Sequence, residues 1–167
     1  MKQWQVVLGA VILAVGMAPA LAEAEQQTLF QHKNWMVAVN SFDDGSVACQ
    51  AAVDEGSESF TIWVFQDQSV RLQFYSTDWN FTEGDTADLQ VEVDRRGEWS
   101  LSNATLTGNS ALFDLPDGDK GVRFLVEVAE GRTAHLRDEN GEGVRDYPLA
   151  GSKASMSALI ECADAIK

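Results

Sequence analysis

The sequence predicts a mainly β protein: an antiparallel β-sandwich or a rolled sheet with a C-terminal helix packed on it. Three observations point to this class. Apolar and polar residues alternate with a period of two along most of the chain, as in strands that bury one face. Turn-forming pairs such as Asp44-Gly45 and Asn140-Gly141 separate the alternating segments. The last segment instead follows the period of a helix with one apolar stripe.

Residues 1–22 have the pattern of a signal peptide. Lys2 gives a positively charged start, residues 6–17 are apolar, and the Ala-Leu-Ala of residues 20–22 offers the small side chains of a cleavage site. The apolar run is shorter than the roughly 20 residues that span a membrane, so we expect cleavage after residue 22. Residues 23–167 then form a single β-rich domain without a membrane span, which is periplasmic or secreted.

The first half of this domain is predicted to be a series of strands. After a polar leader at residues 23–31, Trp35, Val37 and Val39 alternate with other residues before the turn at Asp44-Gly45. Residues 59–66 are rich in β-branched and aromatic residues, and residues 70–74 alternate strictly between apolar and polar side chains. The predicted strands of this half lie at residues 35–39, 47–53, 59–66 and 70–74.

The second half begins with further strands, predicted at residues 89–93, 99–101, 105–107 and 111–115. The segment 119–129 then fits both a helix face and a strand face. Asp119 as an N-cap and Gly131 as a stop favour a helix, whereas the valines favour a strand. We predict a short helix there and leave the strand as the alternative.

The C-terminal segment is predicted to be a hairpin followed by a helix. Strands at residues 133–137 and 144–147 flank Asn140-Gly141. Ser152 can cap the final helix. The residues of its apolar stripe are Met156, Leu159, Ile160, Ala163 and Ile166.

The chain contains only two cysteines, Cys49 and Cys162. Outside the cytoplasm, such a pair favours one intramolecular disulfide, which would join an early strand to the final helix. For so long a loop the chain-entropy model gives about 4–5 kcal/mol. The alternatives, a thiol nucleophile or a metal ligand, find no neighbouring His or second Cys at ligand spacing.

The charge balance limits the classes of partner. Lys and Arg number 12 against 26 Asp and Glu, so the formal net charge is −14. Because this field repels phosphate backbones and anionic lipids, we expect no nucleic-acid partner and no anionic membrane surface as the main partner.

No assembled catalytic set is visible in the sequence. The two histidines are His32, in the leader, and His135, in a predicted strand, and no nucleophile elbow, zinc motif or phosphate loop occurs. We therefore predict no catalytic residue and no cofactor. A pair of facing carboxylates would suffice for a small hydrolase or lyase, and 26 acidic residues leave that alternative open.

One acidic turn partly matches a calcium loop. Asp138, Asn140 and Glu142, followed by Gly143, occupy the first ligand positions and the bend. The twelfth position, where a Glu should bind, holds Leu149, and the flanks are predicted strands. These three residues are thus weak metal candidates, and we expect a solvated hairpin tip.

The tryptophans divide into two groups. Trp35, Trp63 and Trp99 lie in predicted strands, where a core position is expected. Trp79 and Phe81 lie in a polar loop, where large rings have less cover. Since exposed aromatic rings anchor sugars and protein partners, Trp79 with Phe81 is the candidate binding surface.

Several features together resemble the invasion-associated locus B proteins. These are the export signal, the opening Trp35-Met36-Val37 strand, the Cys-bearing second strand, and the sequence YPLAGS at residues 147–152 before an Ala- and Met-rich helix. That family comprises small exported bacterial β-sandwich proteins linked to host-cell entry. The resemblance implies an envelope location and a β fold, and it brings no catalytic residues with it.

From these observations we expect an exported, non-catalytic protein of the bacterial envelope that binds a protein or glycan partner. The alternative is the small hydrolase or lyase using acidic residues, with or without calcium.

Overall fold

The computed structural model describes residues 25–167. The predicted signal peptide and its cleavage site lie outside these residues. Over the described part of the chain, none of the helices has the length and apolarity needed to cross a membrane.

The described chain forms ten strands and two helices. The mainly β prediction is confirmed, because all ten strands join one antiparallel sheet that is not closed. Its order is β1-β2-β3-β4-β5-β8-β7-β6-β9-β10. The elements are β1 (Glu25–His32), β2 (Trp35–Ser41), β3 (Val47–Asp54), β4 (Glu58–Phe65), β5 (Val70–Ser76), β6 (Thr86–Val93), β7 (Glu98–Thr107), β8 (Ser110–Asp114), α1 (Asp119–Glu130), β9 (Thr133–Asp138), β10 (Gly143–Pro148) and α2 (Ser152–Ala165).

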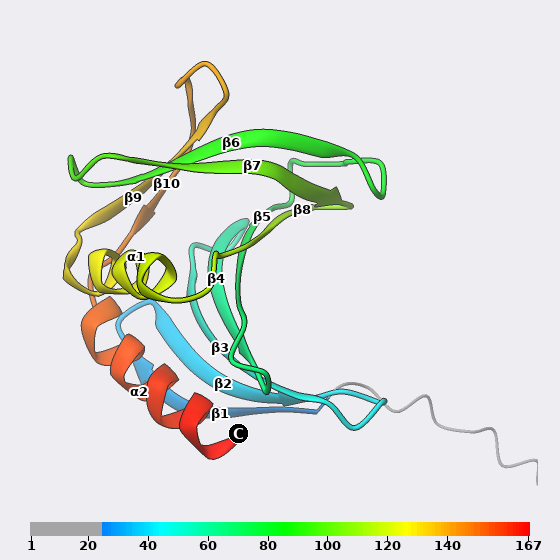
Figure 1. The fold of residues 1–167 in the computed structure, drawn as a ribbon, viewed down its shortest axis with the longest axis vertical. Helices are drawn as coiled ribbons and strands as arrows, with labels where there is room; N and C mark the ends of the chain where they lie inside the picture. Colours follow the sequence, from blue (N-terminus) through cyan, green and yellow to red (C-terminus); the bar gives the residue numbers. More distant parts are fainter. Residues whose placement is uncertain (1–24) are drawn as a thin grey trace, which may run out of the picture.

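Of the two expected architectures, the single bent sheet is the one observed. Strands β1 to β5 follow one another as a meander, and β8 then pairs with β5 and leads to β7, β6, β9 and β10. Figure 1 shows the sheet curving from the N-terminal strands to β6 and β7, with both helices on the same side of β2–β4. The sheet therefore has one helix-covered face and one face that neither helix covers.

The core fills the space between the bent sheet and the helices. Alternate residues of the strands, such as Val37, Ala51, Phe60 and Phe74, are buried on this face. The rings of Phe60 and Phe74 stack at 5.0 Å between centroids. Period-two alternation in the sequence thus corresponds to a buried face, as expected for a sheet covered on one side.

The disulfide between Cys49 and Cys162 is confirmed. The two Cα atoms are 6.0 Å apart and the residues are 113 positions apart in sequence. Cys49 lies on β3 and Cys162 on α2, which also packs against β2. The bond therefore fixes the last helix to the N-terminal half of the sheet.

Segment 119–129 is a helix, as predicted. Phe124 and Val128 of α1 are fully buried, and Gly131 ends the helix with its N–H bonded to a carbonyl of the last turn. Neither predicted side-chain cap is present. Gly118 precedes α1 and Asp119 makes no capping hydrogen bond.

Ser152 connects the two helices instead of capping α2. Gly151 occupies the N-cap position, in the left-handed region with φ at 106°. The Ser152 hydroxyl donates a hydrogen bond of 2.7 Å to the carbonyl oxygen of Val128. The same carbonyl accepts the Gly131 N–H at 3.4 Å, so Ser152 adds a second and shorter hydrogen bond to the last turn of α1.

The predicted polar leader is wrong. Residues 25–32 form β1, which pairs along its length with β2 and has a register shift between Thr28 and Phe30. As an edge strand, β1 is exposed except at Phe30, which is half-buried against the core. Polar residues are compatible with an edge strand, because the backbone makes the pairing and little side-chain area is buried.

Candidate functional site

The uncovered face of the sheet carries mostly polar and small side chains. Along each strand they alternate with the core residues, and on neighbouring strands they are cross-strand partners of one another. We call this surface the polar face; between β2 and β5 it consists of Met36, Ala38, Asn40, Ala48, Gln50, Ala52, Asp54, Ser59, Thr61, Trp63, Phe65, Arg71, Gln73 and Tyr75.

Several residues of the polar face are buried although no helix packs on them. Gln50 is 7% exposed and Thr61 is 6% exposed. Both side chains lie on the face away from the core. Because these two side chains are buried, their amide and hydroxyl groups have little freedom to move.

Trp63 lies in the middle of the polar face and is half-buried. Its indole N–H donates to the side-chain oxygen of Gln73 at 2.8 Å, and the Gln73 amide donates to the Ser110 hydroxyl at 2.9 Å. This chain of hydrogen bonds crosses from β4 through β5 to β8. It fixes the orientation of the indole ring and of the Gln73 amide.

A polar groove of about 690 Å³ lies on one side of Trp63, over β1 to β4. Gln50, the direct cross-strand neighbour of Trp63, is one of its lining residues. The others are Gln31, Lys33, Asn34, Met36, Ala52, Asp54, Glu55, Ser59 and Thr61.

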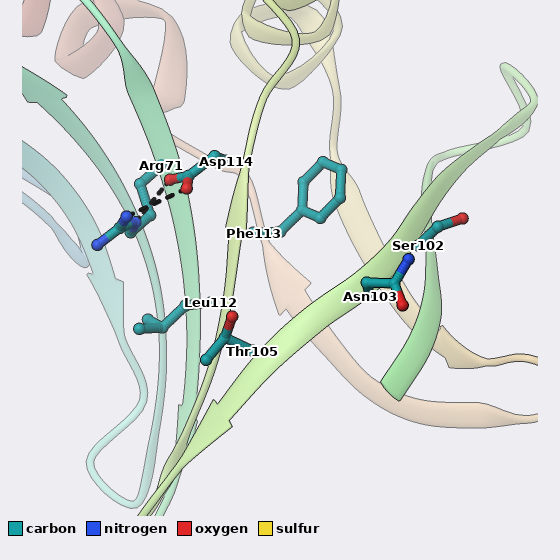
Figure 2. Close-up of a pocket in the computed structure, with 7 residues that line it drawn as sticks. All are labelled: Arg71, Ser102, Asn103, Thr105, Leu112, Phe113 and Asp114. Carbon is teal, nitrogen blue, oxygen red and sulfur yellow. Dashed lines mark hydrogen bonds and ion pairs between the residues drawn. The ribbon is translucent and has the colours of Figure 1, made fainter. Parts of the chain in front are cut away.

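A second hollow of about 300 Å³ lies on the other side of Trp63, where β7 and β8 diverge (Figure 2). These strands pair only from Thr105 opposite Leu112 to their connecting turn. Beyond that point, Figure 2 shows Ser102 and Asn103 across the gap from Phe113. Arg71, which lines this hollow, is the cross-strand neighbour of Trp63 on β5.

Arg71 is held by a two-pronged ion pair with Asp114. The Nε–Oδ1 distance is 2.6 Å and the Nη2–Oδ2 distance is 3.1 Å. The hydrogen bonds that Arg71 donates to Asp114 raise the pKa of Arg71 above its ordinary value. The guanidinium also lies 5.5 Å from the centre of the Phe65 ring. The ion pair therefore fixes the orientation of the Arg71 guanidinium, which lines the hollow.

The carboxylates of the groove act as hydrogen-bond acceptors for its own turns. Asp54 accepts from the backbone N–H of Gly56 at 2.6 Å, and Glu55 accepts from the Asn34 side chain at 2.9 Å. The groove therefore combines amide, hydroxyl and carboxylate groups, and Trp63 lies beside it as the cross-strand neighbour of Gln50. This set can orient a polar ligand by hydrogen bonding.

Trp79 and Phe81 lie away from the polar face. Their rings are 5.4 Å apart, both are half-buried, and Trp79 packs against the core. The side-chain amide of Asn109 donates to the backbone carbonyl oxygens of Ser76 and Trp79, which holds this loop in place. Their role as a binding surface stays a prediction.

In the acidic turn between β9 and β10, the Asp138 carboxylate forms hydrogen bonds with the backbone of the turn itself. Asp138 accepts hydrogen bonds of 2.9 Å from the backbone N–H groups of Asn140 and Glu142. Among residues 25–167, no three His, Cys, Asp or Glu side chains come together as a metal site.

The core prediction is confirmed for Trp35 and wrong for Trp63. Trp35 is fully buried. Trp99 is half-buried against the core, with its indole N–H bonded to Glu127 at 2.8 Å. The position of Trp63 on the polar face was not predicted because apolar and β-branched residues occupy both faces of its strand, so alternation does not separate the faces.

Comparison of the chain with protein-family models, with curated proteins and with solved structures finds no match.

Proposed function

We propose that the protein is an exported, non-catalytic binding protein whose polar face recognises a polyhydroxylated ligand such as a glycan. The observation that carries this proposal is the position of Trp63. Its cross-strand neighbours Gln50 and Arg71 line the two hollows on either side of it.

The chemistry of this surface suits a sugar. Sugar hydroxyls both donate and accept hydrogen bonds, and the side chains of Gln50, Ser59 and Thr61 offer both functions in a groove. The apolar face of a sugar ring packs on an aromatic ring, and Trp63 supplies one between the hollows. The openness of both hollows along the sheet fits a chain of several sugar units better than a single small molecule.

The proposed location is the periplasm or the medium. A disulfide is compatible with an oxidising compartment, and the pattern of residues 1–22 supports export. The likeness to the invasion-associated locus B proteins belongs to this proposal as well, and it agrees with a partner on a cell surface.

The test is a binding titration with maltohexaose, cellohexaose and chitohexaose, in which isothermal titration calorimetry measures the affinity. We expect saturable binding of at least one of these probes. Trp63→Ala should weaken it about tenfold or more, equivalent to about 1.4 kcal/mol. Trp63→Phe should retain more affinity because it keeps an aromatic ring.

Trp79→Ala is the matched control, since it removes an indole elsewhere on the molecule. Equal affinity of Trp79→Ala and the unaltered protein supports the polar face as the site. Loss of binding in Trp79→Ala with no loss in Trp63→Ala would instead place the ligand on the Trp79–Phe81 surface. Absence of saturable binding to all three probes would contradict the sugar proposal.

A further inference from the structure

A hollow of about 510 Å³ lies at the turn between β6 and β7, next to the start of β9. Its lining residues are Asp94, Arg95, Arg132, Thr133 and His135. Two arginines and a histidine in one hollow are unexpected in a chain whose formal net charge is −14. None of these residues lines the groove or the second hollow beside Trp63.

The pairing of the other arginines makes this hollow distinctive. Four described arginines form ion pairs with carboxylates, and a fifth, Arg123, lies over the Trp99 ring at 5.0 Å. The four pairs are Arg71–Asp114, Arg96–Glu130, Arg137–Glu92 and Arg145 with Glu58 and Asp78. Within residues 25–167, Arg95 and Arg132 form no such pair, and both side chains are exposed.

The backbone that carries these two arginines is fixed by Asp94. One carboxylate oxygen of Asp94 accepts hydrogen bonds from the backbone N–H groups of Arg132 at 3.0 Å and Thr133 at 3.1 Å. The backbone N–H of Asp94 donates to the Thr133 carbonyl at 2.9 Å. These backbone hydrogen bonds, that of Arg132 first, hold the pKa of Asp94 below its ordinary value. The turn of Arg95 is therefore tied directly to Arg132 and to the start of β9.

His135 adds an oriented ring to the hollow. Its Nδ1 atom lies 2.6 Å from a carboxylate oxygen of Asp146 on β10. On the opposite side, Glu92 of β6 is its cross-strand neighbour and is paired with Arg137. With Nδ1 engaged by Asp146, Nε2 is the ring nitrogen that remains for a ligand.

We propose that this hollow binds an oxyanion group, a sulfate, phosphate or carboxylate, between the guanidinium groups of Arg95 and Arg132. Guanidinium groups bind oxyanions through paired charge-assisted hydrogen bonds. The Thr133 hydroxyl is a further donor in the lining. This inference does not depend on sugar binding by the polar face.

The test is an NMR titration with sodium sulfate, sodium phosphate and sodium glucuronate at constant ionic strength. We expect saturable shifts of the Arg95 and Arg132 side-chain Nε–H signals and of the Thr133 backbone amide. A response to glucuronate alone assigns a carboxylate ligand, whereas a response to sulfate or phosphate assigns a tetrahedral anion. Either of these two outcomes supports the proposal.

The double variant Arg95→Gln/Arg132→Gln should weaken binding about tenfold or more relative to the unaltered protein. The control is Arg123→Gln combined with Lys120→Gln, which removes the same charge from α1, outside the hollow. This control should bind with unchanged affinity. Equal losses in the two double variants would show a general charge effect and overturn the proposal. Shifts that never saturate with any of the three salts would overturn it as well.

Discussion

At the residue scale, Tyr147 is the clearest case of a polar atom held in the core. The residue is fully buried, its ring packs against Phe60 and Phe74 at 5.8 Å, and its hydroxyl has no hydrogen-bond partner in the described chain. Burial, together with the negative charge of Glu58, raises the pKa of Tyr147 far above its ordinary value. The hydroxyl is therefore kept neutral in the folded protein.

Tyr147→Phe should leave the free energy of unfolding at neutral pH unchanged or raise it by about 1 kcal/mol. The physical reason is that the variant removes a buried, unpaired hydroxyl and keeps the ring. Chemical denaturation measures this change. A loss of more than about 2 kcal/mol would show that the hydroxyl makes a stabilising contact.

The same pair of proteins tests the pH dependence. In the unfolded chain Tyr147 loses its proton near pH 10, whereas in the folded protein it keeps the proton to higher pH. The unfolded state then binds fewer protons, so the Tyr147 contribution makes the free energy of unfolding fall as pH rises above about 10. Tyr147→Phe should lose stability less steeply there than the unaltered protein. Parallel curves would contradict the buried, neutral phenol.

At the element scale, the end of α1 is set by close packing at Gly131. A Cβ atom there would overlap Val93 of β6 and would lie 2.9 Å from Leu149, after β10. The φ of Gly131 is −79°, so its conformation is open to other residues and space is the limiting factor. Glycine at this position lets α1 approach the sheet.

Gly131→Ala should destabilise the protein by about 1–3 kcal/mol through overpacking. Thermal or chemical denaturation checks this value. Gly141→Ala serves as a comparison in which backbone strain, not overpacking, is the cause of any destabilisation. A Cβ atom at Gly141 would meet open space, but the φ of this residue is 80°. A neutral Gly131→Ala would mean that the sheet and α1 separate without cost.

The disulfide is the second contribution at this scale, because it joins α2 to β3. Cys49→Ser/Cys162→Ser should lower the free energy of unfolding by about 2–5 kcal/mol, mainly because the unfolded chain gains freedom. The measurement is denaturation of the oxidised protein and of the double variant. Because the effect acts through the unfolded chain, amides that exchange by global unfolding should lose protection by about the same free energy in all core strands. An unchanged free energy of unfolding in the double variant would contradict a stabilising disulfide.

Elements were predictable from sequence where one face is buried and the other is not. The strands of Val37 and Phe74 and the hairpin at Asn140-Gly141 follow from alternation and turn residues, as does the helix that ends at Gly131. Strand β1 was missed because pairing with β2, not side-chain burial, makes it a strand. Ser152 was misplaced because its partner, the Val128 carbonyl, is distant in sequence.

At the scale of the whole molecule, the sheet curls until its last strand approaches the middle strands. Arg145 of β10 pairs with Glu58 of β4 at 2.5 Å and with Asp78 at 3.1 Å, although β10 and β4 do not pair as strands. One face of the curled sheet packs on the core and the helices, and the other is the polar face. The polar face could not be predicted from sequence, because it depends on which of two apolar-looking faces of β4 turns inward.

The export part of the account is tested by mass spectrometry of the protein recovered from the envelope and medium of its own cells. We expect a chain that begins at Glu23, since the cleavage pattern ends at Ala22. A retained N-terminus on protein found in the cytoplasm would contradict export and remove the expected setting for the disulfide.

Whether the polar face is the ligand site can be decided by following the indole N–H signals of the tryptophans during a titration with the oligosaccharide that binds. We expect the Trp63 indole signal and the Gln73 side-chain amide to shift together and saturate, while the Trp79 and Trp99 indoles stay in place. Saturable shifts at Trp79 with an unmoved Trp63 would contradict a ligand site on the polar face.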